Sequence, residues 1–294
     1  MKLRAPAPED APAVLDLIVA RDIADLGRPD YTLEDARADW AAPGFDPLRD
    51  AWLAEQDETA LGYALLDDRG AALVTVPPAN EGRGVGTALR AAAEARARER
   101  GEARARQFVA SSNEPARAHL LDAGYEHGLS YFRLRMELTD MIEAPTEIAV
   151  REYERGRDDA PVHALVEQAM AGVQGNEPRS LESWRAAKLD KQGWDPSLWL
   201  LHEDSDGLAG VVLCERFEEG VGYVDYLAVA ARARGRGLGR ALLLHGLAAL
   251  RATGLSAAEL SVQGENASAT RLYESVGMSP VWTVERWEKP LRAA

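Results

Sequence analysis

The sequence predicts a mixed α/β protein that contains two copies of one domain. Two glycine-rich segments carry this prediction, because GRGVGTAL at residues 82–89 and GRGLGRALL at 235–243 are nearly identical. Each segment stands between a strand-like run and a run with helical spacing of its apolar residues. Two further strands precede each segment, and a strand and a helix follow it. This order indicates a mixed sheet with helices on its faces.

One register relates the two copies. Residues 81–125 align with 234–278 without a gap. Chance would not hold a single register through a loop, a helix, a strand and a second helix, so the pattern indicates a tandem duplication. We predict one domain over residues 1–140 and another over 147–294, joined by TDMIEAPTEI at 139–148. Repeated positions include Gly82 and Gly235, Gly84 and Gly237, Gly86 and Gly239, Gly101 and Gly254, Asn113 and Asn266, and Gly124 and Gly277.

The second copy defines the elements most clearly. Apolar and β-branched runs predict strands, in order, at 148–154, 198–204, 208–218, 221–229, 257–263 and 281–291. Helical spacing predicts helices at 159–171, 181–190, 238–253 and 267–276. Gly254 stands where a left-handed cap ends a helix, while Asn266 and Gly277 delimit the last helix. The final strand is expected to close the sheet of its own copy.

Composition limits the kind of protein and its partners. The net charge of −14 disfavours nucleic acid, whose binding depends on neutralising phosphates, and favours amine-bearing partners. No apolar run is long enough for a membrane span, and the N-terminal residues lack the apolar stretch of a secretory signal. The single cysteine, Cys214, ends the run GVVLC and is expected to be buried in a strand. Together these features predict a cytoplasmic protein, either a monomer or a homodimer. The histidines show no metal-binding spacing, so no metal is expected.

A glycine-rich loop between a strand and a helix N-terminus suits a phosphate group. Glycine lets backbone N–H groups converge on an anion, and the helix dipole and loop arginines add positive charge. A P-loop is excluded, because Arg240 and Ala241 follow the last glycine where Lys-Ser/Thr is required. A dinucleotide loop is disfavoured, because the spacing is GxGxG and the loop stands late in the domain. A glycine turn without a ligand remains the alternative, although two in one register favour binding.

The pattern Arg234-x-x-Gly237-x-Gly239 resembles the acyl-CoA pyrophosphate signature of the GCN5-related N-acetyltransferase (GNAT) family. From about Ile148 to Leu291 the sequence resembles a whole domain of that family, through YVDYLAV, RGRGLGRALL and ELSVQGENASATRLYESVGM. The first copy resembles it more weakly. The resemblance implies two tandem GNAT domains of acyl-CoA N-acyltransferase fold. It also implies acetyl-CoA as co-substrate, no metal, and direct transfer to a primary amine of a small molecule.

The resemblance also implies which residues bind CoA. A backbone N–H at Val229, beside Ala228 and Leu227, would hold the thioester oxygen, and one such donor contributes ~3 kcal/mol. Asn266 would cap its helix and contact the pantetheine arm or an ordered water. The implied set is Leu227, Ala228, Val229, Arg234, Gly235, Arg236, Gly237, Leu238, Gly239, Arg240, Asn266, Ala269 and Tyr273.

Acetyl transfer to an amine needs both a proton acceptor and a proton donor. A free alkylamine has a pKa near ~10, so it has to lose a proton before it attacks. In the family a tyrosine at the position of Tyr273 lies beside the CoA sulfur, and here it would protonate the leaving thiolate. Packing under the sheet is the alternative role for Tyr273.

Asp225 is the candidate base, directly or through water. An acid in a mostly apolar strand is costly to bury, which favours a functional role over a structural bond to backbone or arginine. Many family members carry glutamate at the position of Tyr223 or of Asp225, and tyrosine at the first departs from that pattern. Glu167, Glu182 and Glu215 are weaker alternatives. Tyr273 together with Asp225 favours an enzyme over a different class, an acyl-CoA sensor without turnover.

Segment 171–197 lies where GNAT folds cover the acceptor site. Trp184 and Trp194 are expected to form an apolar wall there, and Glu177 or Glu182 to hold a cation. A solvated helix and turn is the alternative. The acceptor stays open between a small-molecule amine in general and a cysteinyl aminosugar.

The first copy keeps the glycine turn but not the chemistry. In the same register Tyr273 becomes Leu120, Asp225 becomes Ala72 and Arg234 becomes Glu81. Leucine cannot protonate a thiolate, alanine cannot move a proton, and glutamate places negative charge where a diphosphate would lie. We predict a structural, non-catalytic domain. A second CoA site there would be formed by Val76, Arg83, Gly84, Val85, Gly86 and Thr87.

Overall fold

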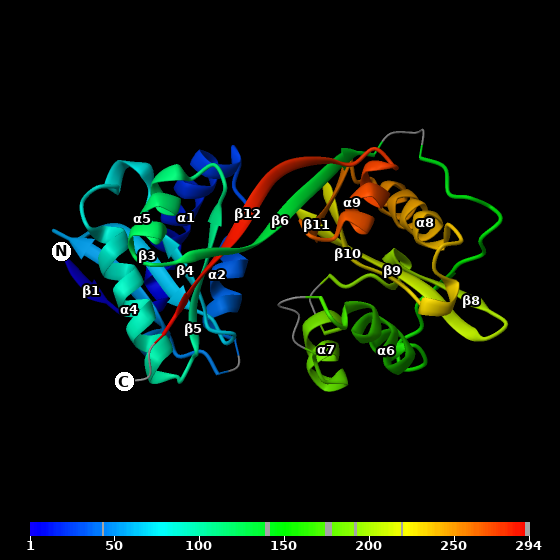
Figure 1. Ribbon diagram of the computed structural model, residues 1–294, viewed down its shortest axis with the longest axis horizontal. Coiled ribbons are helices and arrows are strands. Elements are labelled where there is room, and N and C mark those ends of the chain that lie inside the picture. Colours follow the sequence, from blue (N-terminus) through cyan, green and yellow to red (C-terminus); the bar gives the residue numbers. More distant parts are fainter. Residues whose placement is uncertain (43, 139–141, 174–177, 191–192, 219, 292–294) are drawn as a thin grey trace. The chain divides into compact units, whose positions relative to one another are not determined.

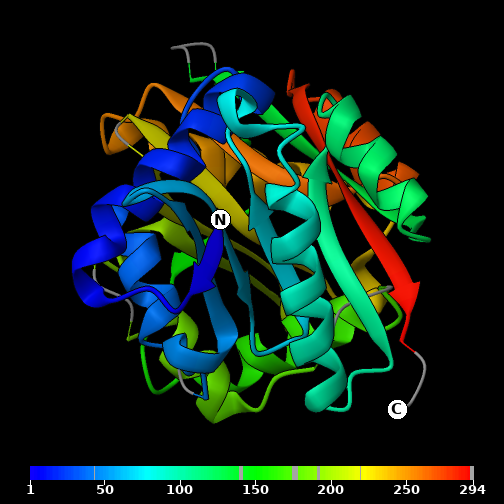
Figure 2. The same cartoon turned by 90° about the vertical axis from the view of Figure 1, so that its left-hand side faces the viewer.

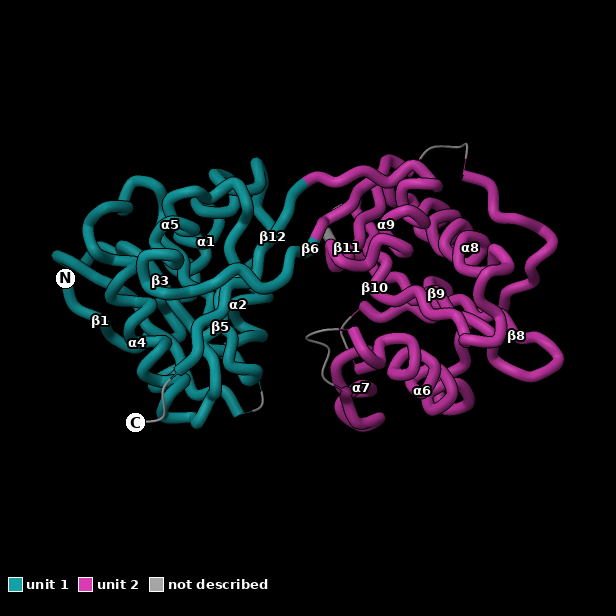
Figure 3. Tube along the Cα trace, in the orientation of Figure 1, with its two compact units in different colours: residues 1–131, 282–294 teal, residues 132–281 magenta. Residues whose placement is uncertain are grey.

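The computed structural model describes residues 1–294 except 43, 139–141, 174–177, 191–192, 219 and 292–294. Its chain divides into two compact units, unit 1 with residues 1–131 and 282–294, and unit 2 with residues 132–281 (Figure 3). Each unit is a sheet with helices on its faces (Figure 1), which confirms the predicted α/β class. Among the described helices, none combines the length and the apolar character that crossing a bilayer requires.

Unit 1 has the strand order β1-β2-β3-β4-β5-β12. Within the part of the chain that the structure describes, β4 and β5 run parallel, whereas β1 with β2, β2 with β3, β3 with β4 and β5 with β12 run antiparallel. The strands are β1 (Lys2–Arg4), β2 (Ala51–Gln56), β3 (Thr59–Leu66), β4 (Ala71–Thr75), β5 (Arg104–Ala110), the first part of β6 (Glu126–Glu137) and most of β12 (Ser279–Pro290). The helices are η1 (Pro8–Asp10), α1 (Ala11–Leu26), α2 (Leu33–Trp40), α3 (Pro47–Asp50), η2 (Pro78–Asn80), α4 (Val85–Glu99) and α5 (Glu114–Asp122).

The alternation of side chains along β3 places helices on both faces of this sheet. Tyr63 and Leu65 pack against α1, whereas Ala64 packs with residues of α4 and Leu66 with the later turns of α4. Figure 2 views this unit with α4 in front of the strands. The core of unit 1 is therefore two layers of apolar contacts, one on each side of the sheet.

Unit 2 has the strand order β6-β11-β10-β9-β8-β7. Its strands are the rest of β6, β7 (Arg151–Glu152), β8 (Trp199–Asp204), β9 (Gly207–Glu218), β10 (Val221–Val229) and β11 (Ala257–Gln263). Its helices are α6 (Asp159–Met170), α7 (Leu181–Lys188), η3 (Pro196–Leu198), η4 (Ala231–Ala233), α8 (Leu238–Ala252) and α9 (Ala267–Glu274). These confirm the predicted elements of the second copy, with β10 and β11 at the predicted bounds.

Several local predictions in unit 2 are confirmed. Gly254 and Gly277 follow α8 and α9 with φ of +84° and +98°, the left-handed region that favours glycine at a helix end. Cys214 is buried in β9, and burial raises the pKa of its thiol. Gly246 lets α8 approach β9 closely, since a Cβ there would lie 2.8 Å from Val212 Cγ2. Of the expected connector, residues 139–141 lie outside the described part, and Ile142 is buried in the core of unit 2.

The last strand does not close the sheet of its own copy, contrary to the sequence-based expectation for 281–291. In β12, residues Val284–Pro290 pair antiparallel with Ala110–Arg104 of β5, in unit 1. Unit 2 takes the end of β6, from the first copy, beside β11. The apolar pattern of a strand predicts that it pairs, but it does not say with which edge. The sequence repeats 1–140 and 147–294 therefore differ from the compact units, and their bounds as domains stay a prediction.

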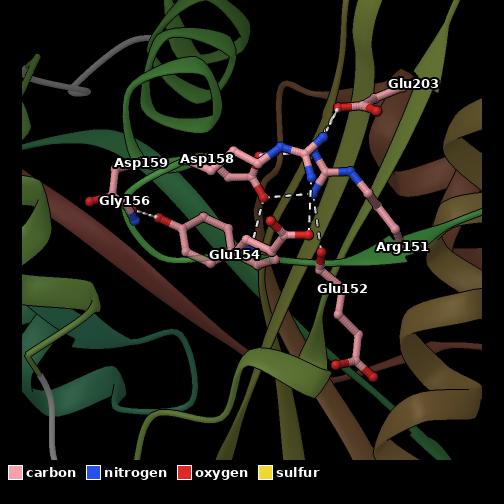
Figure 4. Close-up of polar contacts among 9 residues, drawn as sticks. Arg151, Glu152, Glu154, Gly156, Asp158, Asp159 and Glu203 are labelled. Atoms are coloured by element: carbon pink, nitrogen blue, oxygen red, sulfur yellow. Dashed lines mark hydrogen bonds and ion pairs between the residues drawn. The ribbon is translucent and has the colours of Figure 1, made fainter.

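Both units contain the same charged clamp, which supports the duplication independently. In unit 2, Arg151 donates to Asp158 at 2.6 and 2.8 Å and to Glu203 at 2.6 Å (Figure 4). The clamp ties β7 to the start of α6 and to β8. In unit 1, Arg4 donates in the same way to Asp10 at 2.6 and 2.8 Å, and its Nε lies 2.5 Å from Glu55.

The clamp predicts a difference between two matched variants. The Asp158 side chain is 3% exposed and that of Asp10 is 16% exposed. A buried carboxylate without its partner is costly, so Arg151→Met should lower the free energy of unfolding by about 2–3 kcal/mol, and Arg4→Met by less. Chemical denaturation of the full chain at pH 7 measures both. Equal losses, or the larger loss with Arg4→Met, would contradict this account.

The same loss should depend on pH in a defined direction. Burial alone would raise the pKa of Asp158, but its hydrogen bonds to Arg151 and to the Glu154 N–H hold it below its ordinary value. A lowered pKa contributes stability above the ordinary value of ~3.9, and this contribution disappears as the pH falls through the folded-state pKa. The difference in the free energy of unfolding between wild type and Arg151→Met therefore becomes smaller below about pH 4.

Candidate active site

Two parallel strands diverge in the middle of unit 2. Within the described residues, β10 and β11 are paired only at Val221–Tyr223 with Ala257–Glu259, although both strands run on. On its other side β10 stays paired with β9 as far as Val229. As far as the structure describes the chain, the β11-facing edge of β10 therefore forms no ladder with β11 beyond Tyr223. Leu227, Ala228 and Val229, which the resemblance implies for the thioester, lie on this segment.

The glycine loop follows β10 directly and opens α8. Gly235 and Gly237 have φ of +77° and +81°, and Gly237 is the N-cap of α8. No other residue type adopts these angles at comparable cost, so the glycines are required for the path of the chain. The helix N-terminus at Leu238 therefore presents unpaired N–H groups and a partial positive charge. This is the arrangement that suits a diphosphate.

The side chains of the loop leave the backbone accessible. Arg234 folds back, and its Nε donates to the Val229 carbonyl at 3.0 Å. Arg236 and Arg240 are exposed. A Cβ on Gly239 would lie 3.7 Å from Val229 Cγ2, an ordinary van der Waals contact, so the first turn of α8 lies close to the end of β10 without requiring glycine for space.

α9 brings the predicted acid toward the same place. Asn266 caps α9 as predicted, with its Oδ1 accepting from the Ala269 N–H at 3.1 Å. Tyr273 is the next-to-last residue of α9 and is half-buried. Burial first, and then the neighbouring Tyr223 of β10, raise the pKa of Tyr273 to about 12. The Tyr223 hydroxyl in turn bonds to Ser261 of β11. Tyr273 thus keeps its proton at neutral pH.

Asp225 does not stand alone on its strand. The register of β10 against β9 shifts between Val224 and Tyr226, which makes Asp225 the extra residue of a β-bulge. Its Oδ2 lies 2.6 Å from Nζ of Lys188, the last residue of α7. An ammonium this close stabilises the charged carboxylate and weakens it as a base.

Of the two tryptophans expected to form a wall of the acceptor site, Trp184 is a core residue and Trp194 is partly buried against that core. Trp184 has no exposed surface, and its ring lies 5.7 Å from that of Trp199. Trp194 packs edge-on against Trp199 and Tyr153, at 5.6 and 5.9 Å between ring centroids. The expectation of an open wall is therefore wrong for Trp184. Aromatic content alone does not separate a cleft wall from a core.

The other acids named from the sequence lie in different settings. Glu177 lies outside the described residues. Glu182 is exposed on the first turn of α7, and Glu167 is 3.9 Å from His163 Nε2 on the same helix. Glu215 of β9 faces Tyr223 across the ladder and is half-buried. Of the three acids that the structure describes here, Glu215 shares the β10 environment of Asp225.

Unit 1 repeats the loop beside a cavity of about 370 Å³. Gly82 and Gly84 have φ of +71° and +79°, and Gly84 is the N-cap of α4. Glu81 forms an ion pair with Arg21 at 2.6 Å, and Leu120 lines the cavity in place of tyrosine. Of the six residues predicted for a second CoA site, the cavity is lined by Val76, Gly84, Val85, Gly86 and Thr87. Arg83 instead donates to Asn80 at 3.1 Å.

The sequence did not predict a polar cluster that borders this cavity through Arg90 and His119. Arg90 donates to Glu94 at 2.5 Å and to His119 Nε2 at 3.2 Å, and the Tyr125 hydroxyl donates to Glu94 at 3.2 Å. Burial, and then the Arg90 charge, lower the pKa of His119. In the shared register this cluster replaces a purely apolar set, with Leu243, Leu247, Leu260, Leu272 and Met278 matching Arg90, Glu94, Gln107, His119 and Tyr125. Comparing the copies position by position would have found it.

The fold, the parting of β10 from β11 and the glycine loop that opens α8 agree with the acetyltransferase class. The sequence matches the acetyltransferase (GNAT) family over residues 15–125 and 163–278, one region in each copy. The chain belongs to this family, and it is an acetyltransferase with two tandem GNAT domains. The enzyme interpretation is therefore confirmed against the sensor.

Curated relatives resemble the chain over nearly its whole length. A mycothiol acetyltransferase of Thermobispora bispora is 33% identical over 95% of both chains. One of Streptomyces avermitilis is also 33% identical, over 94% of this chain and 91% of its own. A third, of Actinosynnema mirum, is 30% identical over 82% of both.

Solved structures share the tandem fold. A GCN5-related N-acetyltransferase from Sphaerobacter thermophilus superposes with a TM-score of 0.85 at 28% identity, covering 99% of this chain and 96% of its own. A tandem GNAT protein from the clavulanic acid biosynthesis pathway gives a TM-score of 0.77 at 17% identity, over 98% of both chains. The second likeness concerns the fold alone.

Proposed function

We propose that unit 2 transfers the acetyl group of acetyl-CoA directly to a primary amine of a small molecule. One observation carries the proposal: β10 leaves β11 after Tyr223 and then runs straight into the glycine loop that opens α8. This path supports a proposal in which one continuous segment supplies both the N–H donor to the thioester oxygen, at 227–229, and the diphosphate anchor, at 234–240. In unit 1 the corresponding loop keeps its shape, but Leu120 stands where unit 2 has Tyr273.

In this proposal the diphosphate of CoA lies against the N–H groups between Arg234 and Arg240. The pantetheine arm then enters the gap between β10 and β11 and passes Asn266 and Ala269. Its thioester oxygen accepts from a backbone N–H at Leu227, Ala228 or Val229. That N–H belongs to a fixed strand, so it stabilises the developing oxyanion without reorganisation.

The chemistry balances with one acid and one base. A neutral amine attacks the thioester carbon, the carbon–sulfur bond breaks, and the thiolate takes a proton from the Tyr273 hydroxyl. The pKa of about 12 keeps this hydroxyl protonated over the physiological range. The proton lost by the amine passes to Asp225, directly or through water. Tyr273 is then reprotonated from solvent.

Tyr273→Phe should reduce kcat by on the order of 10²-fold or more, because it removes the proposed proton donor. Thiol release from acetyl-CoA with a set of primary amines measures this, and calorimetry should show unchanged CoA affinity. Tyr131→Phe, which removes a hydroxyl in unit 1, serves as the control and should keep wild-type rates. Wild-type kcat in Tyr273→Phe would remove Tyr273 from the reaction.

Two glycine variants test which unit is active. Gly237→Ala and Gly84→Ala introduce the same strain, because the two residues have φ of +81° and +79°. An L-residue there costs roughly 1–2 kcal/mol and displaces the N–H groups of the loop. Gly237→Ala should raise KM for acetyl-CoA about tenfold, and Gly84→Ala should leave it unchanged. The reverse result would place catalysis in unit 1, and calorimetric stoichiometry would show whether unit 1 holds a second CoA.

A second candidate is mycothiol acetyltransferase activity, in which a cysteinyl aminosugar is the acceptor. The curated relatives favour it, because they carry that name at 30–33% identity over most of both chains. Tyr223 argues against it, because the resemblance to enzymes of this type implies a glutamate at that position, where this chain has tyrosine.

The two candidates differ in a direct assay. We expect turnover of simple primary amines to exceed turnover of the cysteinyl glucosaminyl inositol, measured as kcat/KM under identical conditions. A value for the aminosugar at least 100-fold above all other amines would instead establish the second candidate.

A further inference from the structure

The Lys188–Asp225 pair shows how this site holds an ammonium group. Lys188 Nζ lies 2.6 Å from Asp225 Oδ2, and each side chain is 17% exposed. The same Nζ lies 5.2 Å from the ring centroid of Tyr226. Burial alone would lower the pKa of Lys188, but attraction to and a hydrogen bond with Asp225 raise it, with smaller contributions from Tyr226 and Glu215. Lys188 is therefore fully charged.

These neighbours form a binding environment for a primary alkylammonium. A carboxylate pairs with the charge, and an aromatic ring adds a cation–π attraction. Glu215 adds a smaller attraction for the charge of Lys188. The lysine side chain is itself an alkylammonium on a four-carbon stem. An aliphatic amine acceptor arrives in the same charged form at neutral pH.

The position of Asp225 relates this environment to the proposed reaction. Asp225 is the extra residue of the bulge between Val224 and Tyr226, and bulges redirect side chains. Leu227 and Val229 follow two and four residues later, which is about 7 and 13 Å along the strand. An ammonium on Asp225 therefore lies within the length of one small molecule from the proposed thioester position.

Lys188 is able to leave this place without unfolding its helix. α7 is anchored by Trp184 and Leu189, both buried, and by Arg185, whose Nε donates to Asp159 at 2.7 Å. Lys188 is the last residue of α7, and four rotatable bonds separate its charge from the backbone. The ammonium can move while α7 stays in position.

We propose that Lys188 is a specificity-determining residue that occupies the acceptor's ammonium subsite on Asp225 and is displaced when a primary alkylammonium binds. This inference rests on the proposed function of unit 2. Displacement exchanges one ammonium for another and frees Asp225 to receive the acceptor's proton. An acceptor without a cation, such as an arylamine, has nothing to exchange and does not compete with Lys188.

Lys188→Met removes the competing charge and keeps the stem. KM for an alkylamine such as n-butylamine should fall about fivefold, which corresponds to ~1 kcal/mol for the pair. KM for an arylamine should not change. Arg155→Met, which removes the same charge from an exposed pair with Asp190, is the matched control and should behave as wild type. An unchanged or raised KM for n-butylamine would overturn the inference.

Binding without chemistry separates this inference from the proposed function. Calorimetric titration of n-butylammonium into the full chain should show about fivefold tighter binding to Lys188→Met than to wild type. Lys188→Arg, whose planar fork holds a carboxylate more firmly, should bind it more weakly than wild type. Equal affinity across the three proteins would overturn the inference even if acetyl transfer is found. Failure of all amines to be acetylated would overturn the proposed function, while this titration would still decide the role of Lys188.

Discussion

The candidate site depends on one constraint, the divergence of two neighbouring parallel strands. β10 remains paired with β9 to Val229 but leaves β11 after Tyr223. Backbone groups that leave a ladder need another partner, so the parting of these strands opens this edge of β10 to partners other than β11. The bulge at Asp225 and the left-handed glycines at 235 and 237 lie on the same strand and on the loop that follows it. The strand, the bulge and the loop are therefore parts of one continuous segment.

Duplication preserved this architecture in unit 1 and changed the chemistry of its surroundings. β4 and β5 are also paired over only two positions before the glycine loop, and Gly84 caps α4 as Gly237 caps α8. The apolar contacts under α8 have become a charged network around Glu94 in unit 1. Such a network is stable because each buried charge has a partner, which apolar packing does not require. Catalytic side chains can thus be lost while the loop and helix start are retained.

Much of the fold was accessible from the sequence, because periodicity and glycine positions act locally. The bounds of β10 and β11, the caps at Asn266 and Gly254, and the burial of Cys214 all follow from residues within a few positions. The pairing and the contacts of distant segments could not be predicted from the sequence. The pairing of β12 with β5 and the contact of Lys188 with Asp225 join residues far apart in the sequence, and no pattern within either segment specifies the other. Trp184 was misassigned for the same reason.

A structure of the chain with bound CoA would test the central claim most directly. We predict diphosphate oxygens within hydrogen-bond distance of the N–H groups from Gly235 to Gly239, and the sulfur between β10 and the Tyr273 hydroxyl. CoA bound only at the cavity of unit 1, or seated in unit 2 away from this loop, would contradict the account.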